Sequence, residues 1–513
     1  MLALKNQLNG LTGQLSTGQV AQTYGGLGTG RSTALGAQAT LSALTGYAAG
    51  ITAAKTRTDL AVTSLTQVAS LGTSTRTVLD NGLQSTPINT TASTSTAVAN
   101  LSAALDALTQ SAAGNYLFGG KNVATQPVLG SDAILNGTTD GTGQALAGLK
   151  TLIGEQVQAD VGSKGLGRLT QTSPGQTTPA AAKLGTNQIS LTDDTYAGST
   201  AQFGYALTGA ATGTGSFLTP AYVSATANTP SSTTLSLTSQ PNVGDSVTLN
   251  LRLPDGTSTT LTLTAATSAD AASTTSFTIG SDLPTTTNNL SQALTRALTT
   301  SAGSTLTANA TARASQNFFA ASASAGTTPN RITTDPTTGR PTGYVTGAAS
   351  KTIVWYQGES DPSGTSDPRA TQSVQVSATS TIKVGARANE LPIQNVLAGL
   401  ATAAFGMSST SNVNAGTTYQ AVASKSNSLL ASADTSPSVQ DIVTTLSLAS
   451  AGLANAATTN TATQNTIQNT LDGIEQAPTE EVAAKLLELQ TRLQASYQIT
   501  SSLSKLSLVN YIS

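Results

Sequence analysis

Large apolar side chains recur at helical spacing near both ends of this 513-residue chain. At the start, steps of four, three and four residues connect Leu4, Leu8, Leu11 and Leu15. Near the end, similar steps run through a longer set: Val482, Leu486, Leu489, Leu493, Tyr497, Leu503 and Leu506. Such spacing predicts one apolar face on each helix. Terminal residues usually fray unless something covers them, so we expect the two terminal helices to pack against each other.

Further inwards, both ends of the chain predict a second set of helices. Their expected seam consists of Leu44, Ile51, Leu65, Leu101, Leu105, Leu108, Ile442, Leu446, Leu453, Ile467 and Leu471. In the C-terminal part, the spacing is heptad-like and the seam turns small and polar at Ala456, Asn460 and Thr463. Thr479 is expected to cap the last helix, with Glu480 and Glu481 placed favourably in its first turn.

In the middle of the chain, residues 120–385, the residue pattern changes and predicts strands. In "DSVTLNLRLPDGTSTTLTLTA", apolar and polar residues alternate on both sides of Pro254-Asp255-Gly256. This alternation around a turn predicts a β-hairpin. A helix around Leu290, Leu294 and Leu298 is expected to cover one face of the sheet.

These observations predict an α+β protein with long antiparallel, coiled-coil-like helices from both termini and a large β-rich insert that faces outward. We expect residues 1–30 and 478–513 to form an inner helical layer, and residues 31–119 and 386–477 an outer helical bundle. Residues 120–385 would form the insert as a separate part, in one or two lobes. Because neither end can bury its stripe alone, the seam either closes within one molecule or joins neighbouring subunits. We favour neighbouring subunits, because the helices lie at the extreme ends and no conventional core is evident elsewhere.

The composition excludes several classes of function. Hydrophobic residues make up 38% and charged residues 9%, and the chain contains no Cys and no His. Cys nucleophiles, thiolate or imidazole metal sites and Ser-His-Asp triads are therefore excluded. We expect no enzyme activity, no cofactor and no bound metal.

The net charge of -2 argues against nucleic-acid binding. The chain has no run of 18 consecutive apolar residues, so we expect no membrane span. The start, "MLALKNQLNGLTGQ", lacks the hydrophobic run of a secretory signal.

Two short stretches resemble ligand-binding sites, one for phosphate and one for a cation, but their details favour ordinary loops. "GGLGTGRS", from Gly25 to Ser32, nearly spells a phosphate-binding loop, but Arg stands where Lys is needed and no buried strand precedes it. We interpret it as a flexible loop between helices. Glu359, Asp361 and Asp367 could bind a hard cation, but their spacing favours a turn-rich surface loop.

Aromatic residues in two segments indicate packing rather than binding. Tyr116, Leu117 and Phe118 are expected to form a hydrophobic plug where the chain leaves the helical layer, although a patch for a partner protein is the alternative. Trp355 and Tyr356 stand in the strand-like run "KTIVWYQGE". We expect both to lie in the core of the insert.

Four segments resemble the bacterial flagellin superfamily. "QLSTGQ" resembles the turn that follows the first helix of that family, and the terminal "EEVAAKLLELQTRLQASYQITSSLSKLSLVNYI" resembles its last helix. "GNYLFGGKN", residues 114–122, and "VGARANELPIQNVLAGLATAA", from Val384, resemble segments of the hook-filament junction proteins. The match covers roughly the first 125 and last 130 residues. "WYQGESDPSGTSDPR", from Trp355, resembles inserts of some alphaproteobacterial flagellin-like proteins.

The resemblance implies a structural subunit of the flagellar filament that self-assembles through its terminal helices into a helical tube for swimming. It implies many copies of the chain as partners, together with the flagellar export apparatus, a chaperone, and the hook-associated and cap proteins. The protein would be extracellular, exported without a cleaved signal peptide. Here the sequence before the "LSTG" turn is shorter than is usual in the family, so the first helix is expected to be several turns short.

Two other functions remain open from the sequence. The first is a hook-filament junction protein of the same family, favoured by "NYLFGG" and "ARANE", whereas the size of the insert favours the filament subunit. The second is a secreted, β-rich adhesin with a helical stalk, whose terminal helices would be dispensable for assembly.

Overall fold

The computed structural model describes residues 2–85, 88–194, 202–361, 366–407 and 415–512, with side chains up to residue 505 in the last helix. It contains 53% helix and 16% strand, which confirms a mixed α+β protein. The chain divides into two compact units. Unit 1 comprises Met1–Thr56, Val374–Ile382 and Ala449–Ser513, and unit 2 comprises Arg57–Ser373 and Lys383–Leu448.

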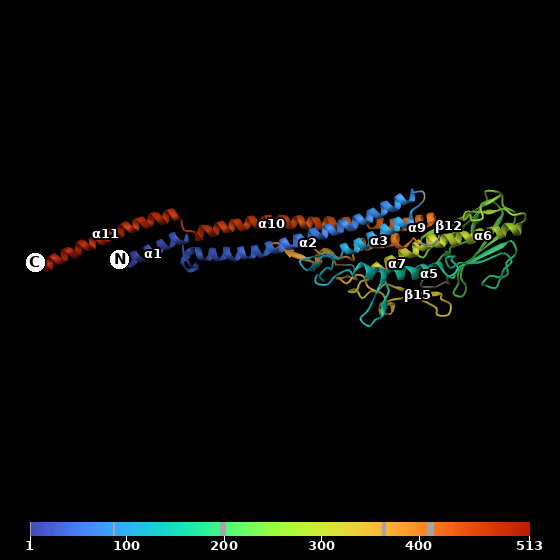
Figure 1. Ribbon diagram of the computed structural model, residues 1–513, viewed down its shortest axis with the longest axis horizontal. Coiled ribbons are helices and arrows are strands. Elements are labelled where there is room, and N and C mark those ends of the chain that lie inside the picture. Colours follow the sequence, from blue (N-terminus) through green and yellow to red (C-terminus); the bar gives the residue numbers. More distant parts are fainter. Residues whose placement is uncertain (1, 86–87, 195–201, 362–365, 408–414, 513) are drawn as a thin grey trace. The chain divides into compact units, whose positions relative to one another are not determined.

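Unit 1 is built mainly from helices at the two ends of the chain (Figure 1). Helices α2 and α10 cross the boundary between the units, so only the first part of α2 and the last part of α10 belong here. The helical elements are α1 (Leu2–Thr17), η1 (Tyr24–Gly30), α2 (Arg31–Leu83), α10 (Val439–Glu475) and α11 (Thr479–Ile512).

The first part of α2 and the last part of α10 run antiparallel within unit 1 (Figure 1). The buried residues Ile51, Leu453 and Leu471 lie on these helices. Asn460, also buried, donates from Nδ2 to the carbonyl oxygen of Leu44 at 2.9 Å. A buried amide without a hydrogen-bond partner would destabilise the fold. This hydrogen bond therefore allows Asn460 to be buried in the predicted seam, and it favours one register of α10 against α2.

Unit 2 contains a large core lined mainly by helices. Its residues come from the second part of α2, from α3, α5, α7, α8 and α9, and from the start of α10. Trp355, Tyr356, Phe318, Phe319 and Phe118 are among its largest fully buried side chains. The other helical elements of this unit are α3 (Thr90–Ala107), α4 (Ser131–Asn136), α5 (Leu149–Val161), α6 (Leu283–Ser301), η2 (Ala302–Leu306), α7 (Thr307–Ala320), η3 (Gly347–Ser350), η4 (Pro368–Thr371), α8 (Leu391–Phe405) and α9 (Ala415–Ser432).

This core corrects two sequence-based expectations. The middle of the chain contains helices α5 and α7, which were not predicted, and their buried faces share a core with α3 and α8. Residues 120–385 therefore do not fold entirely apart from the flanking helices, and Trp355 packs in this shared core. The expectation that the chain lacks a conventional core outside its ends is also wrong. Small buried residues such as Ala312 and Ala401 allow close helix packing but give a weak periodic signal.

A second core in unit 2 lies among two sheets and α6. One sheet has the strand order β5-β6-β10-β9, and the other has the order β13-β12-β11-β7, with β8 also paired to β11. All neighbouring pairs are antiparallel except β12 with β13. The strands are β5 (Thr170–Thr172), β6 (Gln188–Thr192), β7 (Ala206–Leu207), β8 (Thr212–Gly213), β9 (Leu218–Val223), β10 (Ser232–Leu237), β11 (Ser246–Arg252), β12 (Ser258–Ala266) and β13 (Ser276–Thr278).

Within the described ranges, the further strand pairs are small. They join β1 to β2, β3 to β4, β14 to β15 and β16 to β17. Their bounds are β1 (Ser111–Ala112), β2 (Asn115–Tyr116), β3 (Thr138–Thr139), β4 (Ala145–Leu146), β14 (Arg331–Thr334), β15 (Pro341–Val345), β16 (Ser373–Gln375) and β17 (Thr381–Lys383).

The predicted hairpin and the predicted covering helix are both confirmed. Strands β11 and β12 pair with Val247 opposite Leu263 and Leu249 opposite Leu261. Gly256 in the turn adopts a φ of 85°, which Gly tolerates far better than other residues. Helix α6 buries Leu290, Leu294 and Leu298 in the same core as this hairpin. Asp282 caps α6 by accepting a hydrogen bond from the Thr285 backbone N–H.

A buried carboxylate connects α5, α7 and the segment before β7. Asp160 is completely buried, and its Oδ2 accepts hydrogen bonds at 3.1 Å from Arg313 Nη1 and from Gln156 Nε2. Its Oδ1 accepts one from the Gly204 backbone N–H. Burial raises the pKa of Asp160, and the Arg313 guanidinium offsets this only in part. The carboxylate therefore depends on all three donors.

Replacing Asp160 with Ala should destabilise unit 2 by about 3 kcal/mol, because the change leaves the Arg313 charge and the Gly204 N–H without their partner. Denaturant unfolding followed by circular dichroism measures this loss. Asp132→Ala, at an exposed carboxylate on α4, is the control and should cost less than about 1 kcal/mol. A loss below about 1 kcal/mol for Asp160→Ala would contradict the structural role of this network.

Candidate assembly interface

The two terminal helices of unit 1 meet at their connections to α2 and α10. Helix α1 ends at Thr17, and Gly18 adopts a φ of 71° that turns the chain. The Val20 backbone N–H donates to the Glu475 carbonyl at 2.7 Å, and the Ala477 N–H donates to the Gly18 carbonyl at 2.9 Å. These antiparallel hydrogen bonds hold the C-terminal end of α1 beside the start of α11.

The first turns of α11 are stabilised by local charges. Glu480 and Glu481 lie in the first turn, as predicted, where acidic residues interact favourably with the helix dipole. Hydrogen bonding from Lys485 lowers the pKa of Glu481, and Glu488 pairs with Arg492 one turn further on. The cap prediction was off by one position, because Thr479 is the first residue within α11 rather than the residue before it.

Helix α1 covers only the first half of α11. At 1.5 Å per residue, the 16 residues of α1 extend about 24 Å and the 34 residues of α11 about 51 Å. Val482, Leu489 and Leu493 are buried, whereas Tyr497 and Leu503 are exposed. Because α1 and α11 are antiparallel, the first residues of α1 lie near the middle of α11. Figure 1 shows α11 continuing beyond the first residues of α1.

The structure separates the predicted interface residues by exposure. Leu4, Leu8, Leu11 and Leu486 are half-buried, and Leu15 is exposed. The side chain of Leu506 lies outside the described residues. Two exposed residues of α11, Leu487 and Ile499, were missed because neither belongs to the apolar stripe that begins at Val482.

Exposed apolar side chains are concentrated in unit 1. In the described part of the chain, eight of the fourteen large hydrophobic side chains that are exposed belong to this small unit. They are Leu2, Leu15, Tyr24, Leu35, Leu487, Tyr497, Ile499 and Leu503. Single exposed hydrophobic residues are common, whereas contiguous apolar patches mark interaction surfaces. Three of the eight, Tyr497, Ile499 and Leu503, lie within seven residues of one another on α11. Among the described residues, unit 1 therefore carries more exposed large hydrophobic side chains than unit 2, although it is the smaller unit.

The predicted helical seam is divided between the two units. Leu44, Ile51, Leu453, Ile467 and Leu471 belong to unit 1, where Leu44 and Ile467 are half-buried and the others are buried. The remaining six are buried within the large core of unit 2: Leu65, Leu101, Leu105, Leu108, Ile442 and Leu446.

Two sequence segments that are far apart in the chain pair directly in unit 2. The Gly120 backbone N–H donates to the Ala386 carbonyl, and the Ala388 N–H donates to the Phe118 carbonyl. Gly120 has a φ of 62°, and a side chain there would collide with Glu359. Segment 114–122 therefore lies against segment 384–390, and Phe118 is completely buried, as a plug requires.

The structure does not give the candidate phosphate-binding loop or the candidate cation site the geometry that ligand binding requires. "GGLGTGRS" spans the 3-10 helix η1 and the start of α2, and it follows α1 rather than a buried strand. Asp367 caps η4 through the Arg369 N–H, and Glu359 accepts a hydrogen bond from the Lys121 N–H. Across the described ranges, no three acidic residues converge on a possible metal position.

Comparisons with known proteins add no relative: no family model, curated protein or solved structure matches this chain. Among the described helices, none is both long enough and apolar enough to span a membrane.

Proposed function

We propose that this protein is a flagellin-like structural subunit that assembles through its terminal helices into a helical filament used for swimming. The observation that carries the proposal is the gathering of exposed apolar side chains in unit 1, above all on the part of α11 that α1 does not cover. In a polymer, helices of neighbouring subunits would cover Tyr497, Ile499 and Leu503. A contact of this kind that does not close into a ring gives a filament.

In the proposed filament, the terminal helices of many copies form the wall of a tube around a central channel, and the sheets of unit 2 face outward. The subunit would be exported unfolded through this channel and would fold at the growing tip. The absence of Cys suits this path, because the chain cannot form disulfides during export.

A hook-filament junction protein is the second candidate. The direct pairing of segments 114–122 and 384–390 favours it, because these segments carry the resemblance to junction proteins. The two candidates differ in copy number. A filament subunit polymerises into thousands of copies, whereas a junction protein forms about one ring.

The proposal predicts that a chain lacking residues 486–513 makes no filaments. The deletion removes the exposed residues Tyr497, Ile499 and Leu503 and also the buried Leu489 and Leu493 of α11, while the two large cores of unit 2 lie outside the deleted residues. Purified full-length and truncated proteins would be compared by negative-stain electron microscopy after seeding, and circular dichroism would check folding. Normal filaments from the truncated protein would exclude the proposed assembly. A full-length protein that stays monomeric when seeded would instead favour the junction protein or the adhesin.

A further inference from the structure

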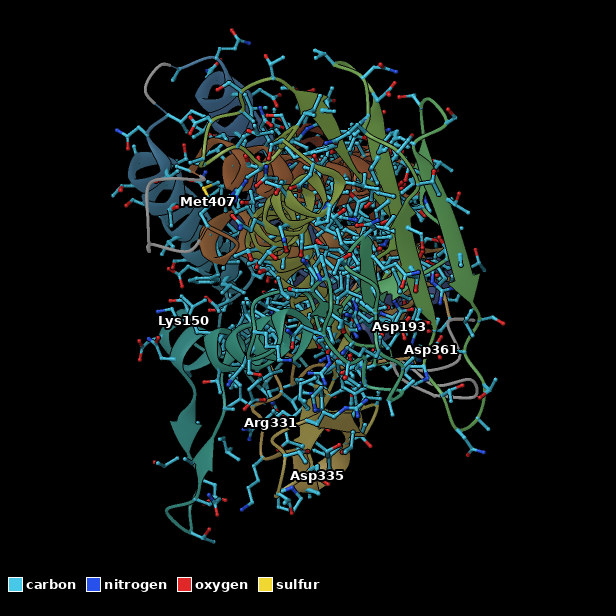
Figure 2. The ribbon with its side chains drawn as sticks, turned by 90° about the vertical axis from the view of Figure 1, so that its right-hand side faces the viewer. Lys150, Asp193, Arg331, Asp335, Asp361 and Met407 are labelled. Carbon is cyan, nitrogen blue, oxygen red and sulfur yellow. The ribbon has the colours of Figure 1, made fainter. Side chains whose placement is uncertain are left out.

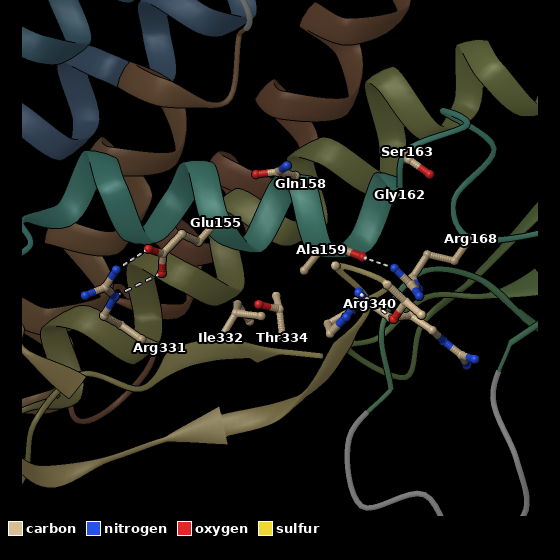
Figure 3. A pocket seen from close by; sticks show the side chains of 13 residues that line it. Glu155, Gln158, Ala159, Gly162, Ser163, Arg168, Arg331, Ile332, Thr334 and Arg340 are labelled. Carbon is tan, nitrogen blue, oxygen red and sulfur yellow. Dashed lines mark hydrogen bonds and ion pairs between the residues drawn. The ribbon is translucent and has the colours of Figure 1, made fainter. Parts of the chain in front are cut away.

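A cavity in unit 2 lies between helix α5 and the hairpin formed by β14 and β15 (Figure 3). Its volume is about 550 Å³, within the range of small-molecule sites. The α5 side contributes Glu155, Gln158 and Ser163, and the hairpin contributes Thr334 and Thr338. Three arginines complete the polar lining: Arg168, Arg331 and Arg340.

Among the described residues that line the cavity, three arginines and one carboxylate, Glu155, are charged. Arg331 pairs with Glu155 through both carboxylate oxygens, as the dashed lines in Figure 3 show. Arg168 pairs with Asp194, and Arg340 Nε lies 3.5 Å from the same carboxylate. Arg340 Nη2 also donates to the Asp194 backbone carbonyl at 2.6 Å, and Asp335 places a further carboxylate on the same hairpin, next to Thr338.

The guanidinium groups keep donors beyond those that hold them in place. Arg331 donates from Nε and Nη2 to Glu155 and from Nη1 to the Ser350 carbonyl. These contacts use three of the five N–H groups of a guanidinium. Arg168 makes a similar set with Asp194 and the Ala159 carbonyl. Planar guanidinium groups with spare N–H donors match a carboxylate in two-point geometry.

Hydrogen bonds hold the turn of the hairpin that carries Arg340 and Thr338. Asp335 Oδ1 accepts hydrogen bonds from the backbone N–H groups of Thr337 and Thr338, and these bonds lower the pKa of Asp335. The Asp335 N–H donates to the Arg340 carbonyl at 2.7 Å. Figure 2 shows Arg331 and Asp335 on this same hairpin. These hydrogen bonds order the turn that carries Thr338 and Arg340, and ordering before binding lowers the entropic cost of binding.

We propose that this cavity binds a small polyhydroxylated carboxylate, such as a sugar acid. The guanidinium donors of Arg331 and Arg168 select the carboxylate. Gln158, Ser163, Thr334 and Thr338 supply amide and hydroxyl groups for the ligand's hydroxyls, and the described residues that line the cavity include no aromatic side chain. The proposal is independent of filament assembly, because every residue of the cavity belongs to unit 2.

The proposal is tested by isothermal titration calorimetry with D-gluconate and sorbitol, which differ only in the carboxylate group. Gluconate should bind with a Kd below about 1 mM, and sorbitol and acetate should each bind at least about tenfold more weakly. No binding of gluconate, or equal binding of gluconate and sorbitol, would overturn the proposal.

Arg340→Gln should weaken gluconate binding at least about tenfold. Arg296→Gln, on α6 and outside the cavity, should leave binding unchanged. If Arg340→Gln fails to fold by circular dichroism, Arg340→Lys replaces it, because Lys keeps the charge but loses the planar fork. An affinity for gluconate that a folded Arg340 variant retains in full would refute the assignment.

Discussion

Replacing Ile499 and Leu503 together with Ser should prevent filament formation at concentrations where the unchanged protein polymerises. The two side chains are 60% and 61% exposed and lie four residues apart on α11, so they share one face. Fully burying each in a subunit contact would contribute about 1.5–3 kcal/mol. Because each 1.4 kcal/mol is a factor of ten, losing both would raise the critical concentration by roughly 10²–10⁴-fold.

The critical concentration would be measured by sedimentation of seeded protein over a dilution series. Val223→Ser with Val243→Ser is the matched control. These two valines are 58% and 63% exposed but belong to unit 2. The control should polymerise like the unchanged protein. Equal critical concentrations for the two double variants would show that exposed apolar residues of α11 carry no special role in assembly.

Replacing Trp355 with Ala should produce the largest loss of stability in unit 2, about 3–5 kcal/mol. Trp355 is completely buried, and its ring meets Phe319 edge-on with centroids 5.3 Å apart. Its Nε1 donates to the Phe319 carbonyl at 3.0 Å. Truncation to Ala removes this hydrogen bond and leaves a cavity between segments that are distant in the sequence.

Denaturant unfolding measures this loss. It is followed by far-UV circular dichroism, because Trp355 is the only tryptophan and the variant has no tryptophan fluorescence. Leu391→Ala, at a leucine that is 63% exposed, is the control and should change stability by less than about 0.5 kcal/mol. A similar small effect for Trp355→Ala would mean that the core of unit 2 is not organised around this residue.

The sequence predicts the elements in which large apolar residues follow a clear period. The alternation from Val247 to Leu263 predicts the hairpin of β11 and β12, and the spacing of Leu290, Leu294 and Leu298 predicts α6. Helix α7 escapes this reasoning, because its buried face consists largely of Ala, Thr and Ser, which also dominate the loops. Such residues reveal a helix only after neighbouring elements have packed against them.

The sequence predicts which helices form the candidate interface, but not which of their residues are buried. The terminal leucine stripes locate α1 and α11, yet the spacing does not tell which residues α1 covers. Leu489 and Tyr497 belong to one predicted stripe, but Leu489 is buried and Tyr497 is exposed. The difference arises from the lengths of the two helices. The spacing also does not tell in which unit a residue of the predicted seam packs. Ile51 and Leu65 continue one pattern but belong to different units.

Hydrogen exchange of the α11 amides, measured by mass spectrometry in monomer and in polymer, tests the central claim most directly. We expect the second half of α11 to exchange quickly in the monomer, because neighbouring helices do not cover its exposed residues. In the polymer, the same amides should become strongly protected, whereas those of α8 in unit 2 should change little. Filaments in which the α11 amides exchange as quickly as in the monomer would contradict assembly through the terminal helices.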